Sequence, residues 1–499
     1  MSSTRGKRLK WNTISSLTFQ LTTIACGFIL PRLILGTYGS QVNGLVNSIT
    51  QFLHIIAFLE LGVGAVVQSS LYKPLADGNR LLTSQIIKSA GNFFSKIAII
   101  LSVYIGILIA VYPLIVNQDF DFIYTATLII AIGISSFAQY YFGVVDRLLL
   151  AADQHGYIQY NAQTATLIVN TLLCALFIKL GASIQIVKLT TSLVYLVRPL
   201  ILRIYVNKHY DIDRKIKLTG EPIKQKWNGI AQHVAAVVLD QTDVIVLTAL
   251  STLTNVSIYS VYQLVVNGVK NLLVSLTSGF QSLMGEYIAR EQETELRSLF
   301  DWTEWLMHTG TTIIFGCTGM LVVPFVMVYT NGVNDANYTV PLFAALITLA
   351  HAGHCLRLPY NLLILAAGHY RQTQHNYIIA ATLNIVVSVA TVKIWGLIGV
   401  AIGTLVAMVY QTIWMALYDS RAILKGVFIS FLKHTVVDAI TVALGVIATM
   451  NIPLLSVTYR SWIIQAFFVF VIWAIIAAGV NLLFYREKVM QLKKKLLRR

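Results

Sequence analysis

Long apolar stretches alternate with short polar segments along almost the whole chain. A helix that spans a bilayer needs about 20 mostly apolar residues. The chain holds fourteen runs of this kind, near residues 12–35, 42–66, 97–116, 122–145, 158–178, 184–206, 229–253, 256–283, 305–329, 338–364, 376–392, 397–418, 435–455 and 460–484. The pattern therefore predicts an all-α integral membrane fold with fourteen transmembrane helices.

The Lys and Arg residues fall on alternate sides of these runs. Of 37 such residues, 28 lie in the predicted cytoplasmic segments 1–11, 67–96, 146–157, 207–228, 284–304, 365–375, 419–434 and 485–499. The opposite loops hold Lys179, Lys393 and Arg460. Because cytoplasmic loops are rich in Lys and Arg, both termini are expected in the cytoplasm. The basic tail is expected to lie against anionic lipid headgroups, or else to serve as a stop signal alone.

The second half of the chain repeats the first at a nearly constant offset. Lys-Trp-Asn stands at 10–12 and again at 226–228, and five further identities follow a shift of 215: Gly64 with Gly279, Tyr72 with Tyr287, Asn161 with Asn376, Gly181 with Gly396, and Tyr195 with Tyr410. Six helices per copy is an even number, so both copies begin on the same side of the membrane. The repeat predicts two six-helix bundles related by a pseudo-two-fold axis along the membrane normal.

The duplication divides the chain into expected domains. They are an N-terminal bundle (1–206), a basic cytoplasmic hinge (207–228), a C-terminal bundle (229–418), helices 13 and 14 (419–484), which have no counterpart in the repeat, and a basic tail (485–499).

Composition narrows the class of protein further. The chain is 56% hydrophobic and 12% charged, against about 25% charged in soluble proteins. The net charge of +16 follows the membrane topology, so it does not indicate nucleic-acid binding. The four cysteines lie far apart within predicted spans, which predicts neither a metal site nor a disulfide framework. Without catalytic motifs or a large outer loop, the sequence is not expected to be an enzyme.

Several charged residues fall inside the predicted spans. A charge near the bilayer centre costs roughly 3 kcal/mol and often marks a functional pathway. The set holds five basic groups and three acids: Arg32 in helix 1, Glu60 in helix 2, Lys188 and Arg198 in helix 6, Asp240 and Asp243 in helix 7, Lys270 in helix 8 and Arg357 in helix 10. The excess of positive charge favours an anionic ligand, since a buried charge needs a partner.

Spacing along each helix shows which groups share a face. Asp240 and Asp243 are three residues apart and lie on one side of helix 7. The same spacing joins Tyr195 to Arg198, and it makes one stripe of His351, His354 and Arg357. Interhelical ion pairs, such as Asp240 with Lys270, are the structural alternative to a ligand site.

Two segments carry a resemblance to a known family. PRLILGTYGSQVNGLVNSITQF at 31–52 and LELGVGAVVQSSLYKPLA at 59–76, together with the Lys-Trp-Asn before helix 1, resemble the bacterial polysaccharide transporters. These are the Wzx-type flippases of the multidrug/oligosaccharidyl-lipid/polysaccharide (MOP) superfamily. The resemblance covers essentially the whole chain and implies a V-shaped pair of bundles around a central cavity. Helices 1, 2, 7 and 8 would line most of that cavity.

The resemblance also implies a function. The cargo would be an undecaprenyl-pyrophosphate-linked oligosaccharide, moved across the bacterial cytoplasmic membrane for capsule or exopolysaccharide assembly, possible partners being other proteins of that assembly. The pyrophosphate would be bound by Arg32, Lys270, Arg198 and Arg357. Glu60, Asp240 and Asp243 would serve in coupling or charge balance. No cofactor and no metal site is expected; Na⁺, H⁺ or the membrane potential would drive the cycle.

Other functions fit the same pattern of helices. A flippase for the peptidoglycan precursor lipid II has the same architecture and an anionic cargo. A cation-coupled multidrug exporter of the superfamily would call for a net negative cavity. A polymerase or scaffold of the capsule machinery would call for a large outer loop.

Overall fold

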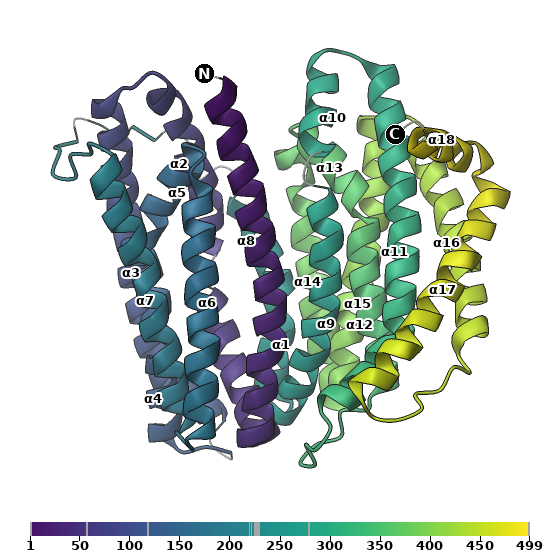
Figure 1. Cartoon of the computed structure of the whole chain (residues 1–499), viewed down its shortest axis with the longest axis horizontal. Coiled ribbons are helices and arrows are strands. Elements are labelled where there is room, and N and C mark those ends of the chain that lie inside the picture. The colour runs from purple at the N-terminus through teal and green to yellow at the C-terminus, as the bar shows by residue number, and fades with distance from the viewer. Residues whose placement is uncertain are drawn as a thin grey trace. The chain divides into compact units, whose positions relative to one another are not determined.

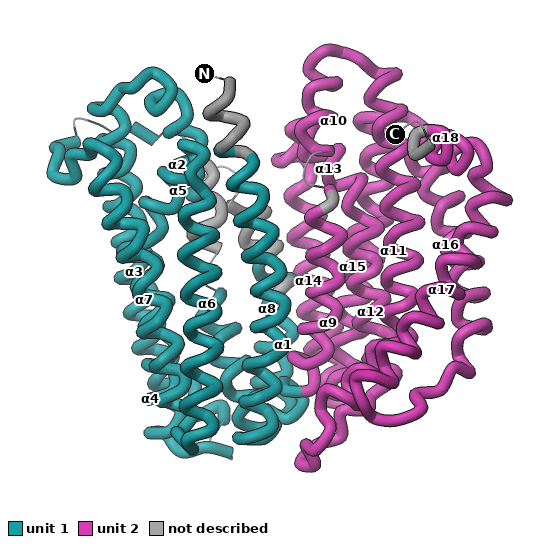
Figure 2. The backbone as a smooth tube through the Cα atoms, in the orientation of Figure 1, with its two compact units in different colours: residues 1–257 teal, residues 258–499 magenta. Residues whose placement is uncertain are grey.

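A computed structural model describes residues 2–55, 58–116, 119–218, 220, 222–223, 230–277 and 280–497. Within these residues, the side chains of 2–7, 9, 58–62, 65, 230–236, 240, 276 and 495–497 are not described. The regular structure of the described residues is helical throughout (Figure 1). The chain forms two compact units, residues 1–257 and 258–499 (Figure 2).

Unit 1 is built from long helices and two short ones. In chain order they are α1 (Ser2–His54), α2 (Phe58–Ala76), α3 (Arg80–Ile115), α4 (Phe122–Ala138), the π-helical turn η2 (Gln139–Gly143), α5 (Val144–Ala152), α6 (Gly156–Lys179), α7 (Ile184–His209) and α8 (Ile230–Leu250). Helix α9 (Leu253–Leu276) begins in this unit and continues into unit 2.

Helix α1 shows how the chain turns between its first two apolar runs. The helix continues through Pro31 and bends at Gly39, whose φ of 84° and ψ of 177° are not helical. Glycine adopts a positive φ easily because it has no Cβ atom. The bend falls in the predicted turn, residues 37–41, and the second apolar run is then divided between α1 and α2.

The predicted loop at 67–96 is wrong. Helix α2 continues to Ala76 and α3 begins at Arg80, so the turn between them is short. Asn79 caps α3, its side chain accepting a hydrogen bond from the Leu82 amide at 3.0 Å, which satisfies one of the unpaired donors of a helix start. At 36 residues, α3 is about 54 Å long. Because α3 is longer than the apolar core of a bilayer is thick, its polar first turns can lie outside that core.

The outer faces of the helices are apolar. On α3, Val103, Ile107 and Leu114 are 60%, 56% and 74% exposed, while Ser84 and Ser89 of the same helix are buried. A water-soluble protein would bury such residues, whereas a bilayer solvates them. This inverted pattern fits a membrane-embedded surface.

Unit 2 contains the rest of the helices. After α9 come α10 (Phe280–Ala289), α11 (Glu293–Tyr329), α12 (Pro341–Leu356), α13 (Leu358–Ala366), α14 (Tyr370–Trp395), α15 (Leu397–Ala422), α16 (Val427–Thr449), α17 (Tyr459–Phe484) and α18 (Arg486–Leu497). Helices α14 and α15 approach closely at two glycines spaced by four. A Cβ atom at Gly403 would lie 2.1 Å from Ser388 Oγ, and one at Gly399 would lie 2.6 Å from the Thr391 carbonyl. Small residues at this spacing let membrane helices pack backbone to backbone.

Helices α16 and α17 pack firmly against α11. The Trp473 side chain of α17 is fully buried. Cβ atoms at Gly316 of α11 and Gly445 of α16 would lie 2.0 Å and 2.6 Å from its ring. The indole therefore fills space that two glycines leave open. The two helices that are predicted to have no counterpart in the repeat are thus integral to unit 2.

Eleven helices among the described residues are long and apolar enough to cross a membrane. They lie at Lys10–His54, Arg80–Ile115, Phe122–Ala152, Gly156–Lys179, Ile184–His209, Glu293–Tyr329, Pro341–Ala366, Tyr370–Trp395, Leu397–Ala422, Val427–Thr449 and Tyr459–Phe484. The protein is thus a multi-pass membrane protein. The count of fourteen spans and the pseudo-two-fold axis stay predictions.

The boundary between the compact units differs from the expected hinge. Helix α8 lies in unit 1, where Thr248 forms a hydrogen bond with Ser48 of α1 at 2.6 Å. The first part of the expected hinge is also held to unit 1, because Arg214 and Arg203 both bind the buried Asp146 carboxylate, at 2.6 Å and 3.3 Å. Residues 226–228 lie outside the described residues. The duplication and its domains remain predictions.

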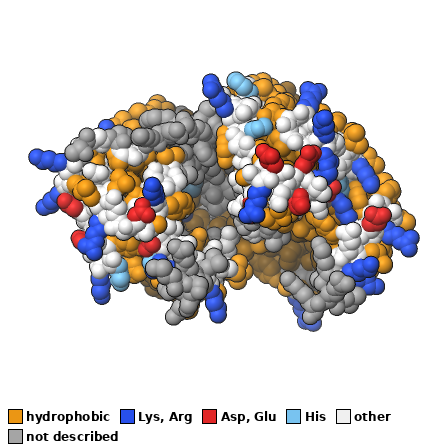
Figure 3. Space-filling view, turned by 90° about the horizontal axis from the view of Figure 1, so that it is seen from above, with side chains coloured by type: hydrophobic (Ala, Val, Ile, Leu, Met, Phe, Trp, Pro, Cys, Tyr) orange, Lys and Arg blue, Asp and Glu red, His pale blue; other side chains and the backbone are white. Residues whose placement is uncertain are grey.

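Figure 3 shows the face of the structure seen from above, with Lys and Arg side chains spread over it and Asp and Glu side chains between them. The cytoplasmic placement of the segments rich in Lys and Arg, and the orientation in the membrane, stay predictions.

Candidate functional site

Unit 1 contains a cavity of about 370 Å³. Four side chains that can carry positive charge line it: His54, Arg147, Lys188 and Arg198. Neutral polar side chains complete its polar surface, namely Thr50, Ser135, Ser136, Gln139, Gln159, Gln163, Thr191, Ser192 and Tyr195. The described residues that line it include neither Asp nor Glu. We call this space the unit 1 cavity.

Arg198 is held in a fixed orientation. Its Nε donates a hydrogen bond to Thr166 Oγ1 of α6 at 2.6 Å. Its guanidinium carbon lies 3.6 Å from the centre of the Tyr195 ring, one helical turn earlier on α7. Such stacking of a cation on an aromatic face is worth about 0.5–2 kcal/mol. The predicted pairing of Tyr195 with Arg198 on one face of this helix is confirmed.

Local backbone features shape the cavity wall. The π-helical turn η2 supplies Gln139 and Gly143 to the lining, and π-turns are frequent at functional sites because they displace side chains from the regular register. A Cβ atom at Gly143 would lie 3.2 Å from the Pro199 ring. This glycine therefore allows η2 to approach α7 beside Arg198.

The charges of the unit 1 cavity suit an anion. Bringing a charge out of water costs several kcal/mol unless a partner offsets it, and the cavity lining supplies no carboxylate for Lys188 or Arg198. An Arg guanidinium binds phosphate through its planar fork and a Lys ammonium binds it as a point charge. The hydroxyl and amide side chains could bind further oxygen atoms of the same ligand.

Unit 2 contains a separate group of cations. Arg357 Nη2 lies 3.0 Å from His354 Nδ1, one turn earlier in the chain. Lys270 of α9 is close enough to interact electrostatically with His351 and His354. The predicted stripe on α12 is thus partly confirmed, with Lys270 beside it.

The remaining predicted site residues are scattered. Arg32 is half-buried on α1 and lies against Gly36, where a Cβ atom would be 3.0 Å from Arg32 Nη1. It is not part of the described lining of the unit 1 cavity. Asp243 of α8 is buried. The side chains of Glu60 and Asp240 lie outside the described residues.

Of the four predicted pyrophosphate-binding residues, Arg198 lines the unit 1 cavity, while Lys270 and Arg357 belong to the cation group of unit 2. The binding and coupling roles of all seven predicted residues stay predictions.

Sequence reasoning missed two members of the unit 1 cavity. Arg147 falls in the predicted loop 146–157, but α5 continues through it and carries its side chain to the cavity. His54 falls within a predicted span and was not singled out. Lys188 was recognised as an intramembrane charge but not assigned to the site. A basic residue near a span boundary is the signal that could have found Arg147.

Comparison with known proteins shows the fold. No family model and no curated protein matches the sequence. Among solved structures, the chain is similar to the lipid II flippase MurJ in an inward closed conformation, with a TM-score of 0.70, 14% identity, and coverage of 96% of this chain and 99% of that one.

Two multidrug transporters are similar as well. A MATE family transporter of the MOP superfamily in an inward-facing conformation has a TM-score of 0.62 and 13% identity, with 82% of this chain and 98% of that one covered. A point mutant of the Vibrio cholerae MATE transporter VcmN has a TM-score of 0.58 and 13% identity, with 84% and 97% covered. The chain is therefore a helical membrane protein with the fold of the MOP-superfamily transporters.

Proposed function

We propose that this protein is a flippase for undecaprenyl-pyrophosphate-linked oligosaccharide repeat units. It would move them from the inner to the outer leaflet of the bacterial cytoplasmic membrane, by alternating access, for capsule or exopolysaccharide assembly. The observation that carries the proposal is the unit 1 cavity, which combines Arg147, Lys188 and Arg198 with many neutral polar side chains.

The chemistry of the cargo matches these groups. A pyrophosphate diester carries about two negative charges, which Lys188 and Arg198 would offset. Sugar hydroxyls form hydrogen bonds with amide and hydroxyl side chains, and the cavity lining supplies both kinds. A volume of about 370 Å³ lies within the range of sites for small ligands and suits the pyrophosphate and the first sugar.

The membrane potential could drive this transport. Each charge that crosses gains roughly 2.3 kcal/mol per 100 mV, so two negative charges moving out of an inside-negative cell would gain about 4–5 kcal/mol. Coupling to Na⁺ or H⁺ through Glu60, Asp240 or Asp243 is the alternative.

A lipid II flippase is the second candidate function. The likeness to MurJ supports it, and its cargo has the same anionic linkage. Complementation of cells that lack their lipid II flippase distinguishes the two, since only the second candidate restores growth. A multidrug exporter for cations is disfavoured, because the described lining of the unit 1 cavity has no carboxylate.

Direct binding tests the proposed site. The full-length protein in nanodiscs is titrated with undecaprenyl pyrophosphate, and Lys188→Gln and Arg198→Gln are compared with wild type. A charge-assisted hydrogen bond is worth about 1.5–3 kcal/mol, so each variant should bind roughly 10- to 150-fold more weakly. Lys179→Gln, which removes an exposed lysine of unit 1, is the matched control. Wild-type affinity in both cavity variants would overturn the site.

Export in cells tests the other two predicted residues. Arg32→Ala and Lys270→Ala should abolish surface polysaccharide while protein levels stay normal. Deletion of the gene should lead to accumulation of lipid-linked repeat units on the cytoplasmic side. Full export by both variants would remove Arg32 and Lys270 from the assignment.

A further inference from the structure

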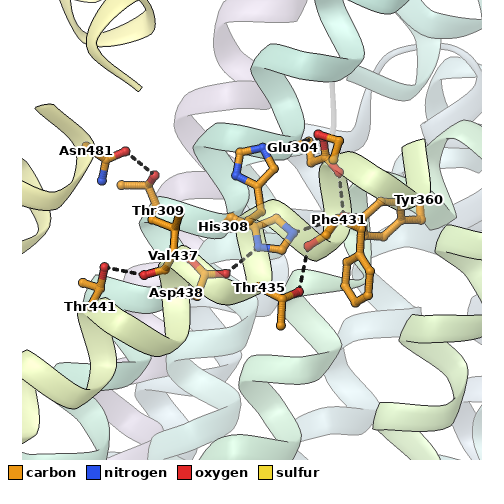
Figure 4. A network of polar contacts seen from close by, with 12 residues as sticks. Glu304, His308, Thr309, Tyr360, Phe431, Thr435, Val437, Asp438, Thr441 and Asn481 are labelled. Carbon is orange, nitrogen blue, oxygen red and sulfur yellow. Dashed lines mark hydrogen bonds and ion pairs between the residues drawn. The ribbon is translucent and has the colours of Figure 1, made fainter. Parts of the chain in front are cut away.

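Unit 2 holds an unbroken chain of proton-carrying side chains (Figure 4). Asp438 Oδ2 of α16 lies 2.5 Å from His308 Nδ1 of α11. His308 Nε2 lies 3.1 Å from the Tyr360 hydroxyl of α13. Tyr360 in turn donates a hydrogen bond to Glu304 Oε1 of α11 at 2.8 Å. A carboxyl, an imidazole, a phenol and a second carboxyl thus follow one another at hydrogen-bond distance.

The chain runs from a partly exposed end to a sealed end. The Asp438 side chain is 15% exposed and that of His308 is 1% exposed, whereas Glu304 and Tyr360 are fully buried. A small cavity of about 10 Å³, roughly the room that one water molecule needs, borders Asp438 and His434. Asp438 is therefore the most exposed member of the chain, and it borders a space with room for one water molecule.

The second oxygen of Glu304 is also bound. Ser430 donates a hydrogen bond to Glu304 Oε2 at 2.5 Å, and His434 Nε2 lies 3.6 Å from the same oxygen. The His434 ring stacks on His308, with 4.9 Å between centroids. These contacts keep Glu304 in one position whether or not it carries a proton.

Asp419 adds a second buried carboxyl at this site. It is fully buried near the end of α15, and neither of its carboxyl oxygens has a hydrogen-bond partner among the described residues. It lies close enough to Glu304 and Tyr360 to interact with both electrostatically. An ionised carboxylate buried without donors is very costly, whereas a neutral carboxylic acid is much less so. A second negative charge nearby also disfavours ionisation of both carboxyls at once.

Other charged or titratable groups surround the two carboxyls. Those near Glu304 are Asp301, His308, Tyr360, His434, Tyr485 and Lys488. Tyr360 and Tyr418 interact with Asp419. Lys433 and Asp438 lie next to this group. The two lysines lie beside the Tyr485 ring, 4.9 Å and 5.9 Å from its centre. No group of three or more metal-ligating side chains with metal-site geometry occurs in the described part of the chain. Each of the groups around the two carboxyls can bind or release a proton.

We propose that Glu304 and Asp419 form a proton-binding site that the Asp438–His308–Tyr360 chain connects to water. A proton from water binds Asp438 and passes to His308. Tyr360 then gives its hydroxyl proton to Glu304 and takes one from His308, so that one O–H bond forms on the carboxyl for each proton taken from water. The same transfers in reverse order return the proton to water.

The site gives helix α16 a function. This helix is predicted to have no counterpart in the sequence repeat, and it supplies Ser430, His434 and Asp438. Given the proposed function, protonation here would couple a proton to cargo movement. Proton binding itself does not depend on that function.

Infrared difference spectroscopy of the full-length protein in nanodiscs tests proton binding without any cargo. Between about pH 5 and about pH 9, wild type should show the carbonyl band of a protonated carboxylic acid, which disappears as the pH rises. Glu304→Gln and Asp419→Asn should each remove or displace this band. Glu295→Gln, an exposed carboxyl on the same helix, should leave it unchanged. A spectrum without this band, or with the same band in both site variants, would overturn the proposal.

Tyr360→Phe tests the connection to water. The variant keeps the buried ring and loses the hydroxyl, so the band should persist while its exchange in heavy water slows at least about tenfold. Unchanged exchange would refute the relay.

Thermal unfolding distinguishes a proton-binding role of Asp419 from a purely structural one. A neutral amide imitates a protonated carboxyl, so Asp419→Asn should melt at the wild-type temperature at neutral pH. If Asp419 were instead an ionised structural partner, this variant would melt clearly lower. Export assays at several pH values then address coupling: a lost infrared band with unchanged export would separate proton binding from transport.

Discussion

Two regions of this protein handle buried charge in opposite ways. The unit 1 cavity is hollow and basic, with Lys188 and Arg198 on a lining that includes no described carboxylate. The network around Glu304 in unit 2 is closed and acidic, and its side chains bind one another. In the unit 1 cavity a bound anion could balance the positive charge of Lys188 and Arg198. Around Glu304 there is no such space, so bound protons must neutralise the carboxyls.

The contrast between the two regions indicates how a function can be assigned to intramembrane charges. A charged residue in an apolar span costs free energy in either setting, so its presence alone does not reveal its role. Cavity volume and the sign of the neighbouring groups distinguish a ligand site from an internal network. The following predictions test whether the two regions are independent and opposite in sign.

Removing the Trp473 ring should have the largest effect on stability. Its side chain fills the space between α11, α16 and α17, and Phe or Trp to Ala substitutions in a core cost about 3–5 kcal/mol. Trp473→Ala should lower the melting temperature and remove the infrared band of unit 2, while undecaprenyl pyrophosphate still binds. Phe467→Ala, at a position 63% exposed on the same helix, is the control. Loss of cargo binding along with the band would show that the two regions are not independent.

Neutralising Lys188 should raise the stability of the ligand-free protein and lower its affinity for undecaprenyl pyrophosphate. Lys188→Met removes a positive charge that no described carboxylate of the cavity balances, so the ligand-free protein should become more stable by about 1–3 kcal/mol. The cost would be weaker binding of undecaprenyl pyrophosphate. Melting curves with and without the lipid measure both effects, and Lys179→Met is the matched control. A destabilised ligand-free variant would contradict an unbalanced charge at this position.

Asp153 offers an ionised acid for comparison. It accepts a hydrogen bond from Tyr210 at 2.7 Å and lies 3.0 Å from His155. Partial burial raises the pKa of Asp153, but the hydrogen bonds from His155 and Tyr210 and the charge of Arg8 outweigh it and hold the pKa below its usual value. Its stabilising effect is therefore present above its unfolded-state pKa of 3.8 and is lost as the pH falls through the lower folded-state value.

Asp153→Asn should therefore lower the free energy of unfolding by about 1–3 kcal/mol at neutral pH. The loss should be much smaller at the lowest pH at which the protein is still folded. Melting temperatures of wild type and variant across pH measure this difference. The carboxyls of unit 2, if they fold with a proton, should show the opposite dependence and lose stability as the pH rises. If Asp153→Asn and Asp419→Asn changed the melting temperature with the same pH dependence, the two carboxyls would not differ in protonation state.

The smallest effect is expected at Gly36. Gly36→Ala in a helix should add about 0.5–1 kcal/mol of stability, while the new Cβ atom would meet Arg32 Nη1 at 3.0 Å and displace the guanidinium. If Arg32 binds cargo, export should fall several-fold although the protein is more stable. Wild-type export would show that the position of this guanidinium is unimportant.

Part of the fold could be predicted because it depends on local sequence. Apolar runs located the long helices, and the glycine-containing segment 37–41 marked the bend of α1. The segments 284–304 and 419–434 are predicted to be cytoplasmic from the distribution of Lys and Arg. The structure shows in addition that Glu304 and Asp419, at the ends of these segments, are fully buried. Hydropathy measures the cost of a residue in lipid, and it cannot register a partner that another helix supplies.

The class of protein follows from the amino-acid pattern, which shows long apolar runs, an excess of basic residues and charges within the predicted spans. Which of these charges contact one another depends on how the helices pack. Arg198 reaches a cavity because α6 supplies Thr166 to orient it, and Glu304 is held by Tyr360 and Ser430, 56 and 126 residues away in the chain. Such pairings arise from helix packing, which brings together residues whose separation along the chain carries no periodic signal.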